Sequence, residues 1–327
     1  MQILSRCVPG LLAAALVLLP AAAPAQTARS SPRQWTAPRT PWGDPDLQGV
    51  WNNGTVTPFE RPAQFENKEL LTEEEAARYE KEMTTRQNAD LRDGTRGTEG
   101  DLARAYNEVW WEHGSKVVAT RRTSIVVDPP NGKVPPLTAE AQRRAQRLAE
   151  ARRKADTPDS WTDMTLRDRC ILYRPLPNLP TNNNNNYEIV QTPGQVAILQ
   201  EEIHETRIIP LDGSPHLHSS VRQWLGDPRG HWEGNTLVVD TTNFTGETDF
   251  RGAGRDLHLV ERWTRKADDR IDYEFTVEDA TAWARPWSGA YTFWKNSGLL
   301  YEYACHEGNL ALKHILESAR AAEKKSK

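Results

Sequence analysis

The sequence predicts a mainly β protein: an antiparallel barrel with an α-helical insertion and a C-terminal helix. From Cys170 onward, short segments of alternating polar and apolar residues are separated by turn residues. Between residues 67 and 168, helical signals replace this alternation, and the last periodic stretch, Leu310–Lys324, has helical spacing. Many short strands joined by tight turns are typical of an antiparallel barrel or sandwich.

The first half of the chain is expected to hold one early strand, Asp46–Asn52, and most of the helices. Thr72 followed by Glu75 forms a capping box, which predicts a helix running to about Gln87. The other elements expected here are helices at Leu102–His113 and Leu137–Ala155 and a strand at Arg121–Asp128. We interpret residues 67–168 as a mostly helical insertion into the β core, which could form a lid.

The second half is expected to supply most of the strands. Pro193-Gly194 and Asp227-Pro228-Arg229-Gly230 are interpreted as turns, and Glu233-Gly234-Asn235 as a tight hairpin turn. The expected strands are Tyr187–Thr192, Gln195–Ile203, Thr206–Leu211, Thr236–Thr242, Leu257–Arg265, Arg270–Val277, Ala284–Lys295 and Leu300–Ala304.

Residues 1–25 have the pattern of a signal peptide. Met1–Arg6 carries one positive charge, Val8–Leu19 is apolar apart from Pro9 and Gly10, and Ala23-Pro24-Ala25 offers a cleavage site. The apolar run is too short for a membrane-spanning helix. We therefore expect a periplasmic or secreted protein cleaved near Ala25, with a flexible leader at 26–45 and a single barrel-like domain at 46–327.

Export changes the expected state of the cysteines. Cys7 would leave with the signal peptide, so the mature chain keeps Cys170 and Cys305. In an oxidising compartment such a pair is expected to form a disulfide, with two separate buried thiols as the alternative. The absence of a C-x-x-C spacing gives no reason to propose a thiolate zinc site.

Charge and aromatic content indicate which kind of molecule the protein binds. Lysine and arginine are scattered and the net charge is −4, so no basic stripe suggests nucleic acid, and no later apolar run could span a membrane. Twelve tryptophans supply apolar surface with one polar handle each. We expect a small organic ligand, aromatic, terpenoid or glycosidic, in a pocket lined by Trp224, Trp263 and Trp287. The alternative for each tryptophan is a place in the core.

Candidate catalytic residues concentrate between Glu201 and Arg265, which hold five of the eight histidines. His216 and His218 would project to one side if the chain is extended there, as a proton-transfer pair requires. Glu261 shares a strand face with Leu259 and Trp263, and burial there would raise its pKa toward that of a general acid or base.

Each of these residues also has an alternative role. Glu261 could form a salt bridge with Arg222, Arg251 or Arg285. Asp240 could orient a histidine, but the alternation does not decide whether its face, or that of Leu237, Val239 and Thr241, points inward. The two histidines could instead bind a ligand by hydrogen bonds or have a structural role.

Further polar residues are candidates for ligand binding. Arg222 is expected to meet an anionic group, and asparagine side chains offer both donors and acceptors for a hydroxyl-rich ligand. The other binding candidates are His204, Asn186, Tyr187 and His258. No cofactor is expected, with a divalent metal on His204, His216 and His218 as the alternative. Nucleotide-binding and serine-hydrolase motifs are absent from the sequence.

Long motifs give the chain a resemblance to a family of secreted bacterial proteins. They include NNNNYEIVQTP, IIPLDGSPHL, RQWLGDPRGHWEGNTLVVDTTNF and YEYACHEGN. The resemblance covers about Asp46 to Asn309 and implies secretion and a decorated lipocalin-like barrel, which Gly49-x-Trp51, similar to the G-x-W of lipocalins, also favours. It brings no activity and no catalytic residues.

Two functions compete. The first is an acid–base enzyme (lyase, isomerase or hydrolase) working on a small molecule with histidine and a carboxylate. The second is a periplasmic lipocalin-like binding protein without chemistry, for which a barrel and tryptophans suffice. The polar groups within expected strands favour the enzyme, because a passive apolar pocket does not need them. A structural or interaction protein is disfavoured by the lack of repeats.

Overall fold

A computed structural model describes residues 35–91, 107–155, 158–248 and 250–325. The expected signal peptide, residues 26–34 of the expected leader, and the first part of the expected helix at 102–113 lie outside them. All the elements below belong to the unit Thr36–Lys327. Within the described residues, no helix is both long and apolar enough to cross a membrane.

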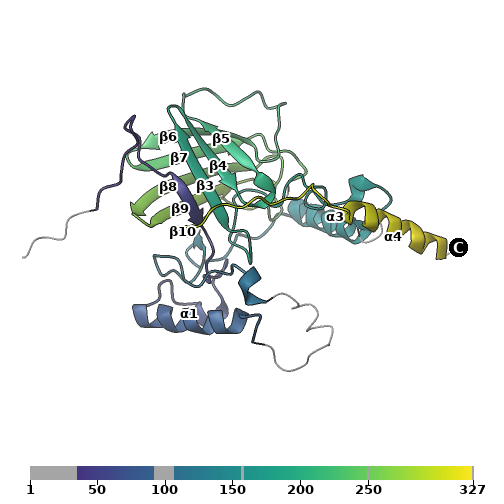
Figure 1. Cartoon of the computed structure of the whole chain (residues 1–327), viewed down its shortest axis with the longest axis horizontal. Helices are drawn as coiled ribbons and strands as arrows, with labels where there is room; N and C mark the ends of the chain where they lie inside the picture. Colours follow the sequence, from purple (N-terminus) through teal and green to yellow (C-terminus); the bar gives the residue numbers. More distant parts are fainter. Residues whose placement is uncertain (1–34, 92–106, 156–157, 249, 326–327) are drawn as a thin grey trace, which may run out of the picture. The chain divides into compact units, whose positions relative to one another are not determined.

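This unit is built on a nearly closed antiparallel β-barrel (Figure 1), as predicted. Its sheet has ten strands, nine of them in the order β5-β4-β3-β1-β10-β9-β8-β7-β6, while β2 pairs with β10. The strands are β1 Gly49–Asn52, β2 Val126–Asp128, β3 Asn186–Thr192, β4 Gln195–Gln200, β5 Thr206–Pro210, β6 Asp227–Glu233, β7 Thr236–Thr242, β8 His258–Ala267, β9 Arg270–Glu278 and β10 Trp287–Lys295. This architecture is compatible with a lipocalin-like fold.

Residue alternation explains why these segments form a barrel wall. Along β8 and β9 almost every second residue is buried, as expected for strands with one face on a core. Tight turns set the register: Gly234 takes a φ of 61° in the hairpin between β6 and β7, which suits a glycine in the first turn position. Pro193 and Gly194 turn the chain between β3 and β4.

Aromatic side chains fill the inside of the barrel. Trp287, Tyr291 and Phe293 from β10 pack with Tyr273 and Phe275 from β9, and all five are at most 2% exposed. Gly289 lies on the same face. A glycine is needed there because a Cβ would come within 2.3 Å of the Phe275 ring. The wall from β8 to β10 is therefore a densely packed core.

The helices lie outside this wall. They are α1 Glu73–Gln87, α3 Ala139–Ala155 and α4 Ala311–Lys325. The predicted capping box starts α1, because Thr72 Oγ1 accepts from Glu75 N at 3.2 Å and Glu75 Oε2 accepts from Thr72 N at 2.8 Å. One-turn 3-10 helices occur at Ala63–Phe65, Glu108–Trp110, Trp161–Asp163 and Glu202–His204.

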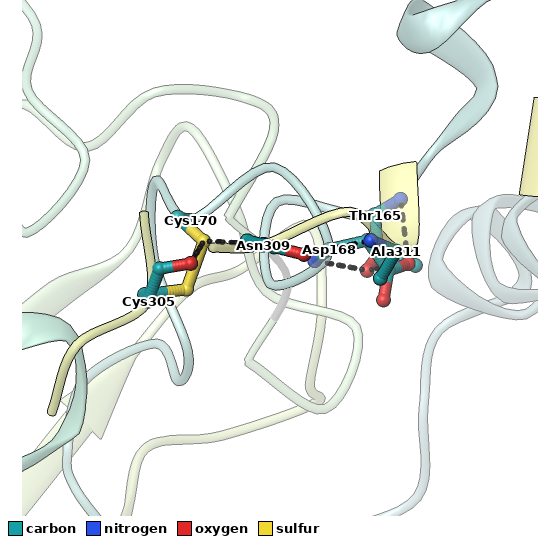
Figure 2. The surroundings of a disulfide bond; sticks show 6 residues. All are labelled: Thr165, Asp168, Cys170, Cys305, Asn309 and Ala311. Atoms are coloured by element: carbon teal, nitrogen blue, oxygen red, sulfur yellow. Dashed lines mark hydrogen bonds between the residues drawn. A yellow bond between two sulfur atoms is a disulfide. The ribbon is translucent and has the colours of Figure 1, made fainter. Parts of the chain in front are cut away.

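The predicted Cys170–Cys305 pair forms a disulfide with a Cα–Cα distance of 5.8 Å. It connects the segment before β3 to the C-terminal segment across 135 residues of sequence. Figure 2 shows Asn309 beside it, where the amide Nδ2 lies 3.2 Å from Cys170 Sγ and Oδ1 accepts from Ala311 N at the start of α4. The disulfide and this cap hold the first turn of the C-terminal helix.

Several expected elements differ in the structure. Residues 227–230 belong to strand β6 and are not a turn; Pro228 is tolerated there because β6 ends the strand order and its outer edge needs no ladder N–H. Residues 300–304 form no strand, and Tyr303 N donates to His204 Nε2 instead. The strand expected at 121–128 is limited to Val126–Asp128, β4 ends at Gln200, and the described part of the helix expected at 102–113 has only one 3-10 turn.

Candidate functional site

The interior of the barrel is too full to be a ligand pocket. The internal void has a volume of about 10 Å³, roughly one water-sized probe. Tyr187, Trp263 and Tyr291 line it, and each is at most 3% exposed. Burial raises the pKa of Tyr187 to about 12, so its hydroxyl stays neutral. Two predicted pocket tryptophans, Trp263 and Trp287, therefore pack in the core.

One ion pair crosses this interior. Arg207 from β5 donates through Nη1 to Glu261 Oε1 of β8 at 3.0 Å, and Tyr273 OH donates to the same oxygen at 2.9 Å. Arg207 is 6% and Glu261 1% exposed. The ion-pair partner of Glu261 is thus Arg207, and not Arg222, Arg251 or Arg285. The inward face of β5 brings Arg207 there, whereas the other three lie on loops.

A large cavity lies between β5 and β6, the two ends of the strand order. We call it the seam groove; its volume is about 740 Å³. Its walls come from residues 205–208 and 210, loop residues 217 and 222–226, residues 227–229 of β6, and Thr245 and Glu247 after β7. A groove of this size suits a small organic molecule.

The seam groove combines apolar side chains with six charged ones. Ile208 is 50% and Leu217 44% exposed, and Trp224 lines the same cavity. Arg222 Nη1 donates to the carbonyl oxygens of Phe244 at 3.1 Å and Arg255 at 2.6 Å, which fixes the guanidinium at the wall. Burial raises the pKa of Glu205, another wall residue.

A chain of histidines and carboxylates lies next to the groove. His216 Nδ1 is 3.2 Å from Asp227 Oδ2, and its Nε2 is 2.9 Å from Asp240 Oδ1. Asp227 is itself a groove residue and also accepts from Leu217 N at 2.8 Å. His216 thus joins the loop wall of the groove to two strands of the barrel.

Asp240 connects this histidine to a second one. His258 Nε2 lies 2.9 Å from Asp240 Oδ2, and this hydrogen bond raises the pKa of His258 against the opposing effect of burial. The same contact, with a smaller contribution from His216, lowers the pKa of Asp240. Leu237, Val239 and Thr241 point inward, so Asp240 belongs to the outer face of β7. The structure thereby settles which face of this strand is buried.

The other predicted residues lie elsewhere. His218 is exposed, and within the described residues its ring hydrogen-bonds to Ser220 Oγ and Ser220 N, so it does not share the environment of His216. His204 accepts from Tyr303 N at 2.8 Å. Asn186 is buried and its amide donates to Glu112 and Glu201. Among the described residues, no group of three or more histidines, cysteines or acids could hold a metal ion.

Sequence reasoning missed Arg207, Asp227 and Thr245. Arg207 could have been found by the argument applied to Glu261, because Arg207, Ile209 and Leu211 alternate on one face of an apolar strand. The sequence predicts a turn at Asp227, and a turn residue is not expected to contact His216 from a strand. Thr245 carries no local signal, since only the folding of the loop places it at the groove.

No protein-family model matches the chain, and neither a curated protein nor a solved structure is found to be similar to it. The resemblance to secreted bacterial proteins therefore stays a prediction. What the fold and the site define is a class of architecture: a nearly closed antiparallel barrel with a filled interior and a groove on its open side.

Proposed function

We propose that this chain is an exported protein that binds a small organic molecule in the seam groove. The observation that carries the proposal is the contrast in volume between the groove, about 740 Å³, and the barrel interior, about 10 Å³. The disulfide supports export, because such bonds persist in oxidising compartments.

The composition of the groove favours a ligand with an apolar, partly aromatic body. Ile208, Pro210, Leu217 and Trp224 offer apolar contact surface, and Arg222 is a polar wall residue held in place by two carbonyl oxygens. Small-molecule sites bind an apolar body on such surface, while polar groups that are fixed in place orient it. An aromatic or terpenoid body fits it better than a glycosidic one.

The test uses 1-aminoanthracene, an uncharged fluorescent aromatic. Ile208→Ser should weaken its binding about fivefold, for loss of on the order of 40 Å² of apolar contact at 25 cal/mol/Å². Val190→Ser is the matched control, because Val190 is similarly exposed (45% against 50%) on the outer face of β3, away from the groove. Fluorescence titration of both variants measures the effect. Equal affinities in the two variants, or no binding at all, would contradict the proposal.

A second candidate is acid–base catalysis on the bound molecule. The observation that favours it is the chain Asp227, His216, Asp240, His258, whose first member lines the groove. A carboxylate that orients a histidine and stabilises its cation is a common arrangement for proton transfer. The reaction would be a lyase, isomerase or hydrolase step.

This candidate is tested by incubating compounds that displace 1-aminoanthracene with substoichiometric protein in D2O. New masses in the product would report turnover, and a His216→Ala, His218→Ala double variant should lose roughly 10²–10⁴-fold in rate. His231→Ala is the control, since His231 is exposed and contacts Glu233 at 3.3 Å. Compounds recovered unchanged would leave binding as the function.

A further inference from the structure

Three buried hydrogen-bond donors of the seam groove have no acceptor. They are Nε of Arg207, Nε of Arg222 and Oγ1 of Thr245, each with no hydrogen-bond partner in the described part of the chain. A buried donor left unpaired costs about 1–3 kcal/mol, and folded proteins satisfy nearly all such groups. All three belong to residues of one cavity, where a ligand that carries oxygen atoms would supply acceptors.

Arg222 is suited to be the main anchor. Its Nη1 is held by two carbonyl oxygens, so the guanidinium is oriented before a ligand arrives. No ion pair joins it to a carboxylate within the described residues, in contrast to Arg229, whose Nη1 lies 2.6 Å from Asp227 Oδ1. Arginine presents its donors in a rigid fork that matches a carboxylate.

Thr245 and Arg207 extend this set of donors. Thr245 N donates to Gln223 O, the neighbour of Arg222, at 3.0 Å, which ties the threonine to the same loop. Arg207 is only 6% exposed. It lines both the groove and the internal void, so it lies between them. Its Nη atoms already serve Glu261, and only Nε is left.

The acids of the groove do not compensate the charge of Arg222. Asp227 is engaged by Arg229, His216 and Leu217 N. Burial raises the pKa of Glu205, which makes its neutral form more accessible. Glu247 is exposed to solvent, where water screens its charge.

We infer that the ligand of the seam groove is an organic anion, a carboxylate on an apolar body, with the carboxylate on Arg222 and Thr245 and the body along Trp224 and Leu217. This inference rests on the proposed binding function and names its ligand class. The Nε of Arg207 donates to an oxygen of the ligand at the floor of the groove.

The experiment compares two matched competitors, 4-phenylbutyrate and 4-phenylbutanol, as displacers of 1-aminoanthracene from the full exported protein. The acid should bind more than about tenfold tighter than the alcohol, because a hydrogen bond to a charged group contributes more than a neutral one. Arg222→Gln should remove this preference, and Thr245→Val should reduce it a few-fold. The controls are Arg262→Gln and Thr242→Val, which make comparable changes outside the groove.

The outcomes separate this inference from the proposed function. If the acid and the alcohol displace the probe equally, and Arg222→Gln changes neither, the groove binds ligands but the anion is wrong. If Arg262→Gln has the same effect as Arg222→Gln, the preference reflects overall charge and the inference is overturned. If 1-aminoanthracene never binds the groove, both proposals fall together. Circular dichroism of each variant confirms that the barrel is folded.

Discussion

Two arginines of this protein, Arg207 inside the barrel and Arg222 on the seam groove, have opposite surroundings. Arg207 has a carboxylate partner, Glu261, which also accepts from a tyrosine hydroxyl. Arg222 has only backbone carbonyls and no carboxylate among the described residues. The charge of Arg207 is compensated by Glu261, whereas the charge of Arg222 has no such partner and is available to a ligand.

This difference separates the packed core, which stabilises the barrel, from the groove in which we propose that a ligand binds. In the interior, aromatic side chains leave almost no space, and a buried charge there is tolerated only with a partner. At the seam, the strand order ends and the chain leaves space, apolar surface and unpaired donors. The same substitution should therefore have different consequences in the two regions.

The disulfide belongs to neither region and should give the largest change in stability. In the chain-entropy model, closing a loop of 135 residues contributes on the order of 5 kcal/mol. A Cys170→Ser, Cys305→Ser double variant should lose about this much in urea unfolding while binding 1-aminoanthracene unchanged. A loss of probe affinity in the folded variant would show that the groove depends on the C-terminal segment.

The ion pair gives the next effect. Arg207→Met should lower the free energy of unfolding by about 3–5 kcal/mol, because it leaves Glu261 buried without a cation. Arg222→Met removes hydrogen bonds to two carbonyls and should cost about 1–2 kcal/mol. Adding Glu261→Leu to Arg207→Met should recover much of the loss. Equal costs for the two arginine variants would contradict the comparison.

Two tryptophans extend the comparison to apolar groups. Trp287 is fully buried in the core, so Trp287→Leu should cost about 2–4 kcal/mol in unfolding free energy. Trp224 lines the groove, and Trp224→Leu should cost less than half as much while weakening probe binding. Parallel unfolding and fluorescence titrations separate the two readouts. If Trp287→Leu weakened probe binding and Trp224→Leu did not, the probe would bind inside the barrel and not in the groove.

The smallest effect concerns pH and the histidine chain beside the groove. The hydrogen bond to Asp240 raises the pKa of His258, so its stabilising effect is complete below about 6.5 and is lost as pH rises through the raised value. At the acid end, the lowered pKa of Asp240 means that stability is lost as pH falls through it. His258→Gln should flatten the alkaline part of this dependence by a few tenths of a kcal/mol, measured by urea unfolding at several pH values. If the wild type and His258→Gln had the same pH dependence of stability, His258 would not contribute to it.

The local sequence determined most of the architecture. Period-two burial in β8 and β9, the Gly234 turn and the Thr72–Glu75 capping box are short-range patterns, and each forms the predicted element. The Cys170–Cys305 pair followed from compartment and number, since only two cysteines remain after residue 7. Such features depend on neighbours within a few residues or on counting, so a sequence is enough to predict them.

Only the tertiary structure decided where a ligand could bind. The alternation of polar and apolar residues placed Glu261 among hydrophobes, but its partner Arg207 lies 54 residues away. Whether a barrel is hollow depends on how side chains from different strands fill a shared volume, and here they leave about 10 Å³. The groove exists because β5 and β6 end the strand order side by side, and the loop between them brings Arg222 and Trp224 to the gap. Packing between strands distant in sequence sets these distances, and no local pattern encodes them.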